Sequence, residues 1–324
     1  MKKVILLAPR IDIAWTGNKH QILVSDPNLA QQPIRQKWLK FVELASNEYK
    51  NRQDVDFECI QIELHRLPFQ FLSQLKADVL LIPHRESHQY KLTNSIPYYY
   101  MQTQYTDLFS VDPKGWGGGA SVYPFTNILS ASCDDIVFNK LKENIKNNIS
   151  KFNQPPEKKM ALPQDYVLFL LQIPHDDTIK YHSKTSVASA LKTVVAATKE
   201  LGIPLVVKGH PVRPDLMKTF ELSLQDQKHV TWKMNFNIHQ LITKARSVVT
   251  VNSGAGFEVL LHEKPVITFG KAEYDCVGNP CTRDNFKSVV QNATYNKEQV
   301  VNFFHHWYHW CYNIEQPDSF KKLP

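Results

Sequence analysis

The sequence predicts an α/β fold with two doubly wound domains that face a central cleft. Apolar runs of strand length alternate with amphipathic runs of helix length, a pattern typical of parallel sheets covered by helices on both faces. The 324 residues are long for one compact core and comfortable for two domains. Residues 151–165 are rich in proline and charge and poor in aliphatics, as expected of a linker between the two domains.

The first half opens on an apolar run, residues 3–9, which we interpret as a strand because it holds only five consecutive apolar residues. The later elements that we expect are helices at 33–52 and 67–76 and strands at 55–64, 77–84 and 96–102. This half alternates less regularly than the second. We predict that residues 1–155 form an N-terminal domain.

The second half alternates regularly. We expect strands at 166–171, 203–208, 229–233, 247–251 and 265–270, and helices at 183–202, 213–225, 237–245 and 256–263. Ser183 is the N-cap candidate of the first helix and Gly202 its end. Residues 160–300 are therefore predicted to form a second domain. Ligands of such sheets bind beyond the carboxyl ends of the strands, so the residues at strand exits are the candidates for a site.

Composition excludes several classes of protein. No apolar run approaches the roughly 20 residues of a membrane span, and the N-terminal run is shorter than a signal peptide requires, so we expect a cytoplasmic protein. The five cysteines form no CxxC pair, which favours reduced thiols and no metal site. The net charge of +7 suits a phosphate-bearing ligand, an anionic lipid or nucleic acid, or merely a mildly basic surface. Nucleic-acid binding is disfavoured because no zinc-finger spacing or RNA-binding aromatic motif occurs.

The stretch "TVNSGAGFE" joins the strand at 247–251 to the next predicted helix. A small turn that leads into a helix exposes backbone N–H groups, which favours an anion such as phosphate. Ser253 adds a hydroxyl donor, and Gly254 and Gly256 allow a close approach of the backbone. Glu258 suits the two hydroxyls of a ribose. The structural alternative is that Ser253 only caps the helix and Glu258 only pairs with its dipole.

The stretch "KGHPVRP" follows the strand at 203–208. Pro211 biases His210 away from helix and presents its imidazole at the loop. Lys208 and Arg213 flank it, and three potential cations within six residues suit a diphosphate or phosphodiester. The alternative is a loop histidine among ordinary surface bases.

Other polar groups follow strands in both halves. In "QIPHDD", Gln172, His175 and Asp176 come after the strand at 166–171. In the first half, His84 and Arg85 come after the strand at 77–84, and Trp116 lies in a glycine-rich loop. Aromatic faces beside glycine and basic groups often bind sugars. An aromatic core with a surface loop is the alternative.

These motifs resemble the bacterial capsule polysaccharide synthesis family that includes retaining β-Kdo glycosyltransferases, where Kdo is an acidic eight-carbon 2-keto sugar. The resemblance rests on "YYMQTQYTDLFSVDPKGWG", "LFLLQIPHDD", "KGHPVRPD" and "TVNSGAGFEVLLHEKPVITFGKAEY", which cover most of the chain beyond about residue 80. Bacterial polysialyltransferases, which use other CMP-sugars, share part of the pattern. This chain departs from the family in carrying Gly254 after Ser253, where a second serine or threonine is frequent.

The resemblance implies a GT-B-like fold of two Rossmann-like domains, in which residues 301–324 form a helix that crosses back to the first domain. It implies CMP-Kdo as donor, a glycan or glycolipid acceptor, and no metal or other cofactor. His210 and Ser253 would contact the CMP phosphate, with Lys208 and Gly254 beside them, and Glu258 would contact the ribose. Asp176 would be the nucleophile and His175 a candidate base. The implied sugar or acceptor contacts are His84, Arg85, Gln102, Trp116, Gln172 and Arg213.

The function implied is transfer of Kdo to a surface glycan such as a capsule or O-antigen, at the inner face of the inner membrane or in contact with other polysaccharide-assembly enzymes. One alternative keeps the fold and takes another CMP-nonulosonate, such as pseudaminic or sialic acid. A second alternative is a sugar-nucleotide or glycan-binding protein of capsule assembly that binds CMP without turnover.

Overall fold

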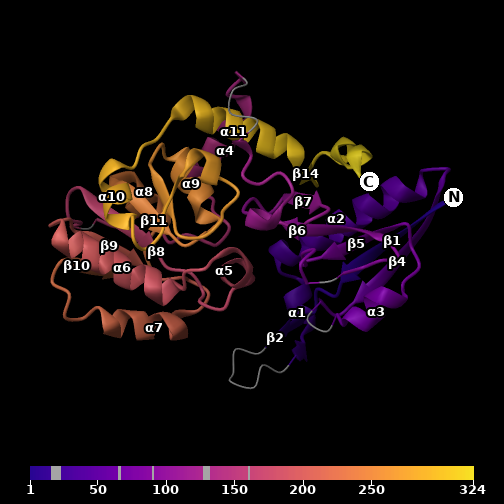
Figure 1. Ribbon diagram of the computed structural model, residues 1–324, viewed down its shortest axis with the longest axis horizontal. Coiled ribbons are helices and arrows are strands. Elements are labelled where there is room, and N and C mark those ends of the chain that lie inside the picture. The colour runs from indigo at the N-terminus through magenta and orange to yellow at the C-terminus, as the bar shows by residue number, and fades with distance from the viewer. Residues whose placement is uncertain (16–22, 65–66, 90, 127–131, 160) are drawn as a thin grey trace. The chain divides into compact units, whose positions relative to one another are not determined.

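The computed structural model of the chain describes residues 1–15, 23–64, 67–89, 91–126, 132–159 and 161–324. The chain divides into two compact units, one formed by Met1–Ser121 with His309–Pro324 and the other by Val122–Tyr308. Each unit holds a six-stranded sheet with helices packed against it (Figure 1). The predicted α/β class, with two Rossmann-like domains, is confirmed.

The first unit has the sheet order β14-β7-β6-β5-β1-β4. Strands β4, β1, β5 and β6 are parallel, whereas β7 and β14 are antiparallel. Its elements are β1 Lys2–Pro9, β2 Ile13–Trp15, β3 Leu23–Ser25, α1 Pro27–Ala30, α2 Pro33–Lys50, β4 Val55–Ile62, α3 Phe69–Gln74, β5 Val79–Pro83, β6 Ile96–Gln102, β7 Leu108–Asp112, β14 Tyr312–Asn313 and 3-10 helices at Gly117–Gly119 and Pro317–Lys322. The chain order reverses between β1 and β5, so the switch point of this sheet lies beside the exit of β5.

The second unit has a fully parallel sheet in the order β10-β9-β8-β11-β12-β13. Its elements are α4 Ile136–Lys146, β8 Tyr166–Leu170, α5 Asp177–His182, α6 Val187–Glu200, β9 Leu205–Lys208, α7 Pro214–Ser223, β10 Val230–Lys233, α8 Ile238–Lys244, β11 Ala245–Thr250, α9 Ala255–Leu261, β12 Val266–Thr268, a 3-10 helix at Asp275–Val277, β13 Asn279–Pro280, α10 Phe286–Asn292 and α11 Lys297–Trp310. Counted along the chain, this is the doubly wound order 3-2-1-4-5-6, with its switch point between β8 and β11.

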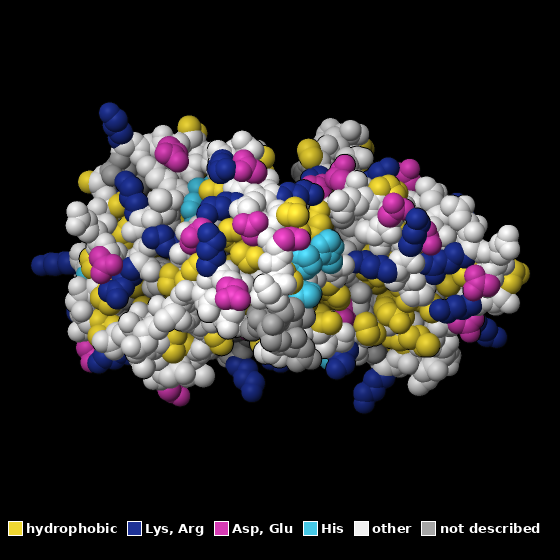
Figure 2. All heavy atoms as spheres, turned by 90° about the horizontal axis from the view of Figure 1, so that it is seen from above, with side chains coloured by type: hydrophobic (Ala, Val, Ile, Leu, Met, Phe, Trp, Pro, Cys, Tyr) yellow, Lys and Arg dark blue, Asp and Glu magenta, His cyan; other side chains and the backbone are white. Residues whose placement is uncertain are grey.

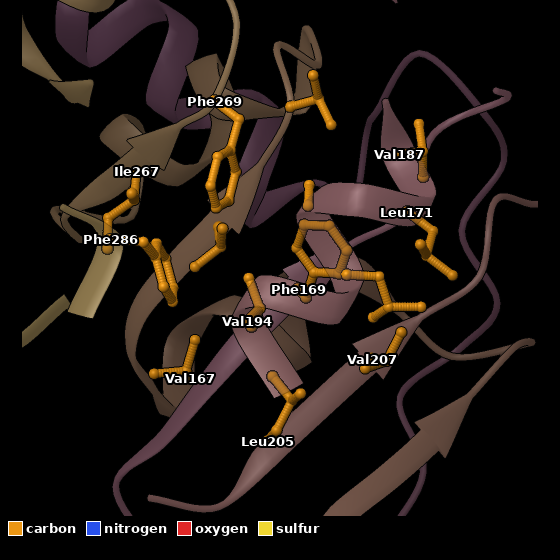
Figure 3. Close-up of a cluster of buried hydrophobic side chains, with 14 of the residues drawn as sticks. Val167, Phe169, Leu171, Val187, Val194, Leu205, Val207, Ile267, Phe269 and Phe286 are labelled. Atoms are coloured by element: carbon orange, nitrogen blue, oxygen red, sulfur yellow. The ribbon is translucent and has the colours of Figure 1, made fainter. Parts of the chain in front are cut away.

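The strands of the second unit are apolar because both faces of their sheet are covered. Every residue of β8 and of β9 is buried. On one face, Val167, Phe169 and Val207 pack with Val194 of α6 and Phe286 of α10 (Figure 3). This core fixes the strands, and therefore fixes where each strand ends and its loop begins.

The boundary between the units differs from the predicted one at 155–160. The chain passes into the second unit at Val122, and α4 belongs to that unit. The ring of Phe138 on α4 lies 5.9 Å from that of Phe304 on α11. Lys142 of α4 also pairs with Glu263, which follows α9, at 2.5 Å. We predicted a linker at residues 151–165 because their composition is polar. In the structure this polar segment belongs to the second unit and packs against it.

The C-terminal segment returns to the first unit, but as a strand rather than a helix. Helix α11 ends at Trp310, after which β14 pairs antiparallel with β7. The hydroxyl of Tyr49 on α2 donates to the carbonyl of Pro324 at 2.9 Å. The predicted crossing at 301–324 is therefore correct in destination, but it is not one helix: α11 ends at Trp310, and a short strand and the 3-10 helix at Pro317–Lys322 follow.

The predicted helix at 183–202 begins later than expected, and a separate short helix precedes it. Helix α5 ends at His182, with Ser183 as its C-cap, and α6 begins after Ser186, whose side chain accepts the N–H of Ser189. Ser183 was therefore the wrong N-cap. Three serine or threonine residues lie within 183–186, and the pattern of apolar residues does not decide which of them caps the helix.

No helix in the described residues is long and apolar enough to cross a bilayer, nor are three His, Cys, Asp or Glu residues grouped there as a metal would require. All five cysteines are free thiols. On the face drawn in Figure 2, lysines and arginines alternate with acidic side chains and form no continuous basic stripe.

Candidate functional site

A buried glutamine joins the two strand ends at the switch point of the second sheet. The side-chain oxygen of Gln172, after β8, accepts the backbone N–H groups of Val251 and Asn252 at 3.0 and 2.9 Å. It also accepts the Thr250 hydroxyl at 2.9 Å. The side-chain nitrogen of Gln172 donates to Oδ1 of Asn252 at 3.1 Å. Gln172 therefore positions the exit of β11, and its predicted contact with sugar stays a prediction.

The turn after β11 offers fewer backbone donors than we predicted. Oγ of Ser253 accepts the N–H of Ala255 at 3.2 Å, and the Ser253 carbonyl accepts that of Gly256 at 3.0 Å. The N–H of Phe257 donates to the carbonyl of Gly254 at 3.0 Å. These groups are used within the turn. The hydroxyl hydrogen of Ser253 can still donate to a ligand, because its bond to Ala255 uses only a lone pair.

The second glycine of the turn is needed for packing rather than for a ligand. A Cβ on Gly256 would lie 2.0 Å from Cζ of Tyr274, far inside contact distance. The hydroxyl of Tyr274 donates to the Ser253 carbonyl at 2.5 Å and so holds the turn from below. Gly254 has φ −55°, which any residue adopts. Our explanation of Gly256 as an opening for the ligand was wrong, and the contact of Gly254 with CMP stays a prediction.

Glu258 and Lys208 are two buried charges of the same site. Glu258 is 4% exposed, and its Oε1 accepts the hydroxyl of Ser150 at 2.5 Å. Lys208, at the end of β9, is 6% exposed. Burial lowers the pKa of Lys208 to about 8, and the nearby carboxylate of Glu258 opposes that shift. The Lys208 ammonium and the Glu258 carboxylate are therefore neighbouring opposite charges, and each favours the charged form of the other.

His210 enters the site as a neutral donor and not as the cation that we predicted. Burial lowers its pKa to about 4, with Lys208 and Lys151 adding to the shift and Asp176 opposing it. The N–H of Val212 donates to its Nδ1 at 3.3 Å. A neutral imidazole that accepts at Nδ1 carries its proton on Nε2, so His210 can donate one N–H to a ligand. Its ring also meets that of Phe152, with centroids 5.4 Å apart.

Arg213 has a partner within its own loop. Its Nε and Nη2 donate to the two carboxylate oxygens of Asp215 at 2.9 and 2.6 Å. The pair lies at the start of α7, and Arg213 directly follows Val212, whose backbone N–H contacts His210. A bidentate carboxylate takes up the two N–H groups that would grip a phosphate. A contact of Arg213 with the sugar or acceptor remains a prediction.

Asp176 begins helix α5, and both it and His175 are exposed. Its Oδ1 accepts the backbone N–H and the hydroxyl of Thr178 at 3.0 and 2.9 Å. Asp176 is therefore the N-cap of α5. Its charge also acts on His210 and on Lys151, so it belongs to the same electrostatic cluster. His175 has only its place beside Asp176 to favour a role as base.

The segment that we interpreted as a linker supplies groups that the sequence did not reveal. The side-chain nitrogen of Asn237 donates to Oδ1 of Asn148 and to the carbonyl of Pro155, at 2.7 and 2.9 Å. Gln154 accepts the N–H of Ile238 at 3.0 Å. The segment is thereby pinned to the start of α8. Its residue Lys151 interacts electrostatically with Asp176, Glu273 and Glu258.

A second missed feature is the loop after β12. Tyr123 donates its hydroxyl to Oδ2 of Asp275 at 2.7 Å, and Oδ1 accepts the Thr268 hydroxyl at 2.8 Å. Asp275 is buried, and burial raises its pKa despite these bonds. Nζ of Lys271 lies 5.4 Å from the centroid of the Tyr123 ring. The sequence pointed to this loop as a strand exit, but not to its pairing with Tyr123.

In the first unit, His84 and Arg85 follow β5 as predicted. His84 has φ 56°, an uncommon backbone angle for a residue other than glycine, and its ring stacks on Trp38 at 6.4 Å. Arg85 donates to the carbonyls of His84 and Leu64 at 2.9 and 2.5 Å. Arg85 therefore holds the loop, and the half-buried His84 is the side chain presented at the strand exit.

The glycine-rich loop around Trp116 is held by two buried carboxylates. Oδ1 of Asp112 accepts the N–H groups of Lys114, Gly115 and Ser121 at 2.8, 3.2 and 2.8 Å. A Cβ on Gly119 would lie 2.6 Å from Oε1 of Glu86, so glycine there makes room for the acid. Trp116 is 5% exposed, and its ring lies 5.9 Å from that of His84. The structure thus brings Trp116 and His84 together.

The side-chain nitrogen of Gln102 is used in hydrogen bonds within the first unit. Gln102 is 5% exposed, and its side-chain nitrogen donates to the carbonyls of Thr106 and Ile34 at 2.8 and 3.3 Å. These bonds join the end of β6 to the start of α2. A direct contact with sugar or acceptor stays a prediction for Gln102.

Residues 138–308 match the family described as capsule polysaccharide biosynthesis protein. Over 136 residues the chain is 32% identical to the capsule polysaccharide export protein KpsS of Escherichia coli, a match that takes in 38% of this chain and 34% of that protein. The chain thus aligns with about a third of the length of that curated relative.

Two solved structures are similar in fold. The β-Kdo 2,7 transferase of KpsC from Thermosulfurimonas dismutans has a TM-score of 0.51 and 16% identity, over 82% of this chain and 86% of that one. The β-Kdo 2,4 transferase of the same protein has a TM-score of 0.48 and 16% identity, over 81% and 87%. The family match covers more than half of the 324 residues and includes every described site residue of the second sheet. The chain belongs to the capsule polysaccharide biosynthesis protein family.

Proposed function

We propose that the protein is a retaining glycosyltransferase that moves Kdo from CMP-β-Kdo to a glycan or glycolipid acceptor of a capsule or related surface polysaccharide. One observation carries the proposal. Lys208 ends β9, His210 follows it, and Glu258 lies on α9 after β11; Lys208 interacts electrostatically with both of the others in a doubly wound sheet whose switch point lies between β8 and β11. That is where sheets of this order bind nucleotides. The family and its Kdo transferase relatives support the choice of donor.

CMP would be bound by side chains more than by backbone amides. The Nε2–H of His210, the hydroxyl of Ser253 and the ammonium of Lys208 donate to phosphate oxygens. Glu258 accepts a ribose hydroxyl, while its other contact holds Ser150. Because CMP leaves as a phosphate monoester, stabilising its charge assists the breaking of the bond to the sugar.

The chemistry proposed for Asp176 is a double displacement. Its carboxylate attacks the anomeric carbon, the bond from that carbon to the phosphate oxygen breaks, and CMP leaves with the electron pair. The acceptor hydroxyl then attacks the same carbon, its proton passes to a base such as His175, and the Asp176 carboxylate is released. Two inversions give net retention. Since Oδ1 is held by Thr178, the attacking atom is Oδ2.

The first unit would bind the sugar or the acceptor. The half-buried ring of His84 would contact the sugar at the strand exit, and the buried ring of Trp116 packs beside it. The acidic and glycine-rich surroundings of Trp116 keep its loop in one conformation through Asp112. A surface glycan made in the cytoplasm would reach this unit at the inner membrane.

Asp176→Asn is the sharpest test of this mechanism. Asparagine caps a helix as well as aspartate does, so the variant keeps α5 but loses the nucleophile. We expect release of CMP from CMP-Kdo to fall at least 1,000-fold while the unfolding temperature stays unchanged. Asp177→Asn, next in the chain, is the matched control and should retain activity. Full activity of Asp176→Asn would remove Asp176 from the chemistry.

The same assay separates the alternatives. Turnover of CMP-pseudaminate or CMP-sialate but not of CMP-Kdo would identify a different nonulosonate as the donor. Binding of CMP without turnover of any of the three, with acceptor glycans present, would favour a non-catalytic binding protein.

A further inference from the structure

The three residues that the sequence suggested as cations for a phosphate supply little positive charge in the structure. His210 is neutral at physiological pH, because its pKa lies at about 4. Arg213 is engaged by Asp215. Lys208 faces the carboxylate of Glu258. Of the three cations that the sequence suggested, only one remains, and a carboxylate already balances it.

A further cation lies on the docked segment before β8. Ser150 is anchored by its hydrogen bond to Glu258 at 2.5 Å, and Phe152 by its ring contact with His210 at 5.4 Å. Both neighbours of Lys151 in the chain therefore contact residues that we place at the nucleotide. An anchored backbone on either side restricts where the side chain of Lys151 can reach.

The electrostatic surroundings of Lys151 agree with this geometry. Asp176, Glu273 and Glu258 each favour its charged form, whereas burial acts against it and lowers its pKa. Asp176 and Glu273 lie in the loops after β8 and β12, and Glu258 lies on α9, the helix after β11. Lys151 is thus near the proposed nucleophile and near the proposed ribose contact at once. In the proposed donor, the phosphate links the ribose to the carbon that Asp176 attacks.

We propose that Lys151 binds the phosphate of the CMP donor and is the principal positive charge that stabilises CMP as it leaves. This inference rests on the proposed function. The segment 148–158 is then part of the nucleotide site instead of a spacer between domains. Lys208, whose charge Glu258 largely balances, is then the weaker of the two cations that contact the phosphate, and Lys151 supplies the stronger one.

The test compares CMP with cytidine, which lacks the phosphate. In Lys151→Met, we expect CMP to bind 10- to 100-fold more weakly, the range that losing one charged hydrogen bond gives, while cytidine binding is unchanged. Lys151→Arg should retain most of the affinity for CMP, because it keeps the charge. Lys159→Met is the matched control, since Lys159 lies exposed on the same segment and the substitution removes the same charge.

The outcomes distinguish this inference from the proposed function. If the wild-type protein does not prefer CMP to cytidine, the nucleotide site itself is wrong. If it does, and Lys151→Met binds CMP normally, Lys151 is not the phosphate ligand. If Lys151→Met binds both CMP and cytidine more weakly, and by the same factor, Lys151 has a structural role and the inference is likewise overturned. Ser150→Ala provides a second variant. It removes the hydrogen bond that anchors the segment to Glu258 but removes no charge, so it should weaken CMP binding less than Lys151→Met does.

Discussion

The side-chain nitrogen of Gln172 donates to Oδ1 of Asn252 at 3.1 Å, and the side-chain oxygen of Gln172 accepts the backbone N–H of Asn252 at 2.9 Å. The two residues follow β8 and β11, neighbouring strands at the switch point of the second sheet. The side chain of Asn252 continues the chain of bonds by donating to the carbonyl of Thr178 at 2.8 Å. One glutamine therefore links the exit of β8, the turn at Ser253 and the helix that Asp176 caps.

Gln172→Leu should destabilise the second unit strongly. The replacement has a similar volume, but it leaves three buried donors without their acceptor, and each such loss costs about 1–3 kcal/mol. We expect the free energy of unfolding to fall by about 3 kcal/mol or more, measured by urea denaturation. Gln225→Leu, at an exposed position after α7, is the control and should change stability by less than about 0.5 kcal/mol. Equal stability of the two variants would contradict the role assigned to Gln172.

The strands of this site were predictable, and their connections were only partly so. Residues of β8 and β9 form continuous apolar runs, which identify buried parallel strands, and the exits then follow by position. Docking of the segment around Lys151 depends on side-chain bonds to Asn237 and Glu258, which no periodicity records. Likewise, the sequence does not indicate that His210 is neutral, because its pKa is set by burial.

Gly256→Ala should disrupt the turn that carries Ser253. The added Cβ would lie 2.0 Å from Cζ of Tyr274, and Tyr274 is buried, so the ring cannot move away freely. We expect a loss of several kcal/mol in unfolding free energy, within the range of overpacked cores. Thermal and urea unfolding of the purified variant would measure it.

A double variant separates the clash from other effects of the substitution. Tyr274→Ala alone should destabilise the unit, because it empties a buried ring position and removes the hydrogen bond to Ser253. In that background, Gly256→Ala should cost much less than in the wild type, since its Cβ then meets open space. Additive costs would show that the ring is not what requires glycine.

Acid should destabilise the second unit through two half-buried histidines. His210 and His262 have pKa values of about 4 in the folded protein, below the ordinary value of 6.5 that the unfolded chain has. Between pH 6.5 and 4, the unfolded state binds more protons, so unfolding free energy falls as pH falls. Each histidine contributes a slope of at most about 1.4 kcal/mol per pH unit.

His210→Gln and His262→Gln should each make this slope shallower. Urea denaturation at several pH values between 4 and 7 would measure it, and the double variant should lose about the sum of the two contributions. The residues lie on separate loops, after β9 and after α9, so additivity is expected. A slope that matches the wild type in both variants would show that other groups control acid unfolding.

Binding of CMP should take up protons near pH 8. The pKa of Lys208 lies at about 8 in the unliganded protein, so about half of the molecules carry its charge at that pH. A bound phosphate favours the charged form and raises the pKa, which draws up to about half a proton per CMP from the solvent. Calorimetry in two buffers of different ionisation enthalpy measures this uptake directly.

The affinity for CMP should also weaken between pH 7.5 and 9.5 as Lys208 loses its charge. Lys208→Arg, which stays charged over this range, should show a smaller uptake and a flatter pH dependence. If wild-type protein and Lys208→Arg take up the same number of protons, Lys208 does not sense the phosphate, and the proton is bound elsewhere in the cluster.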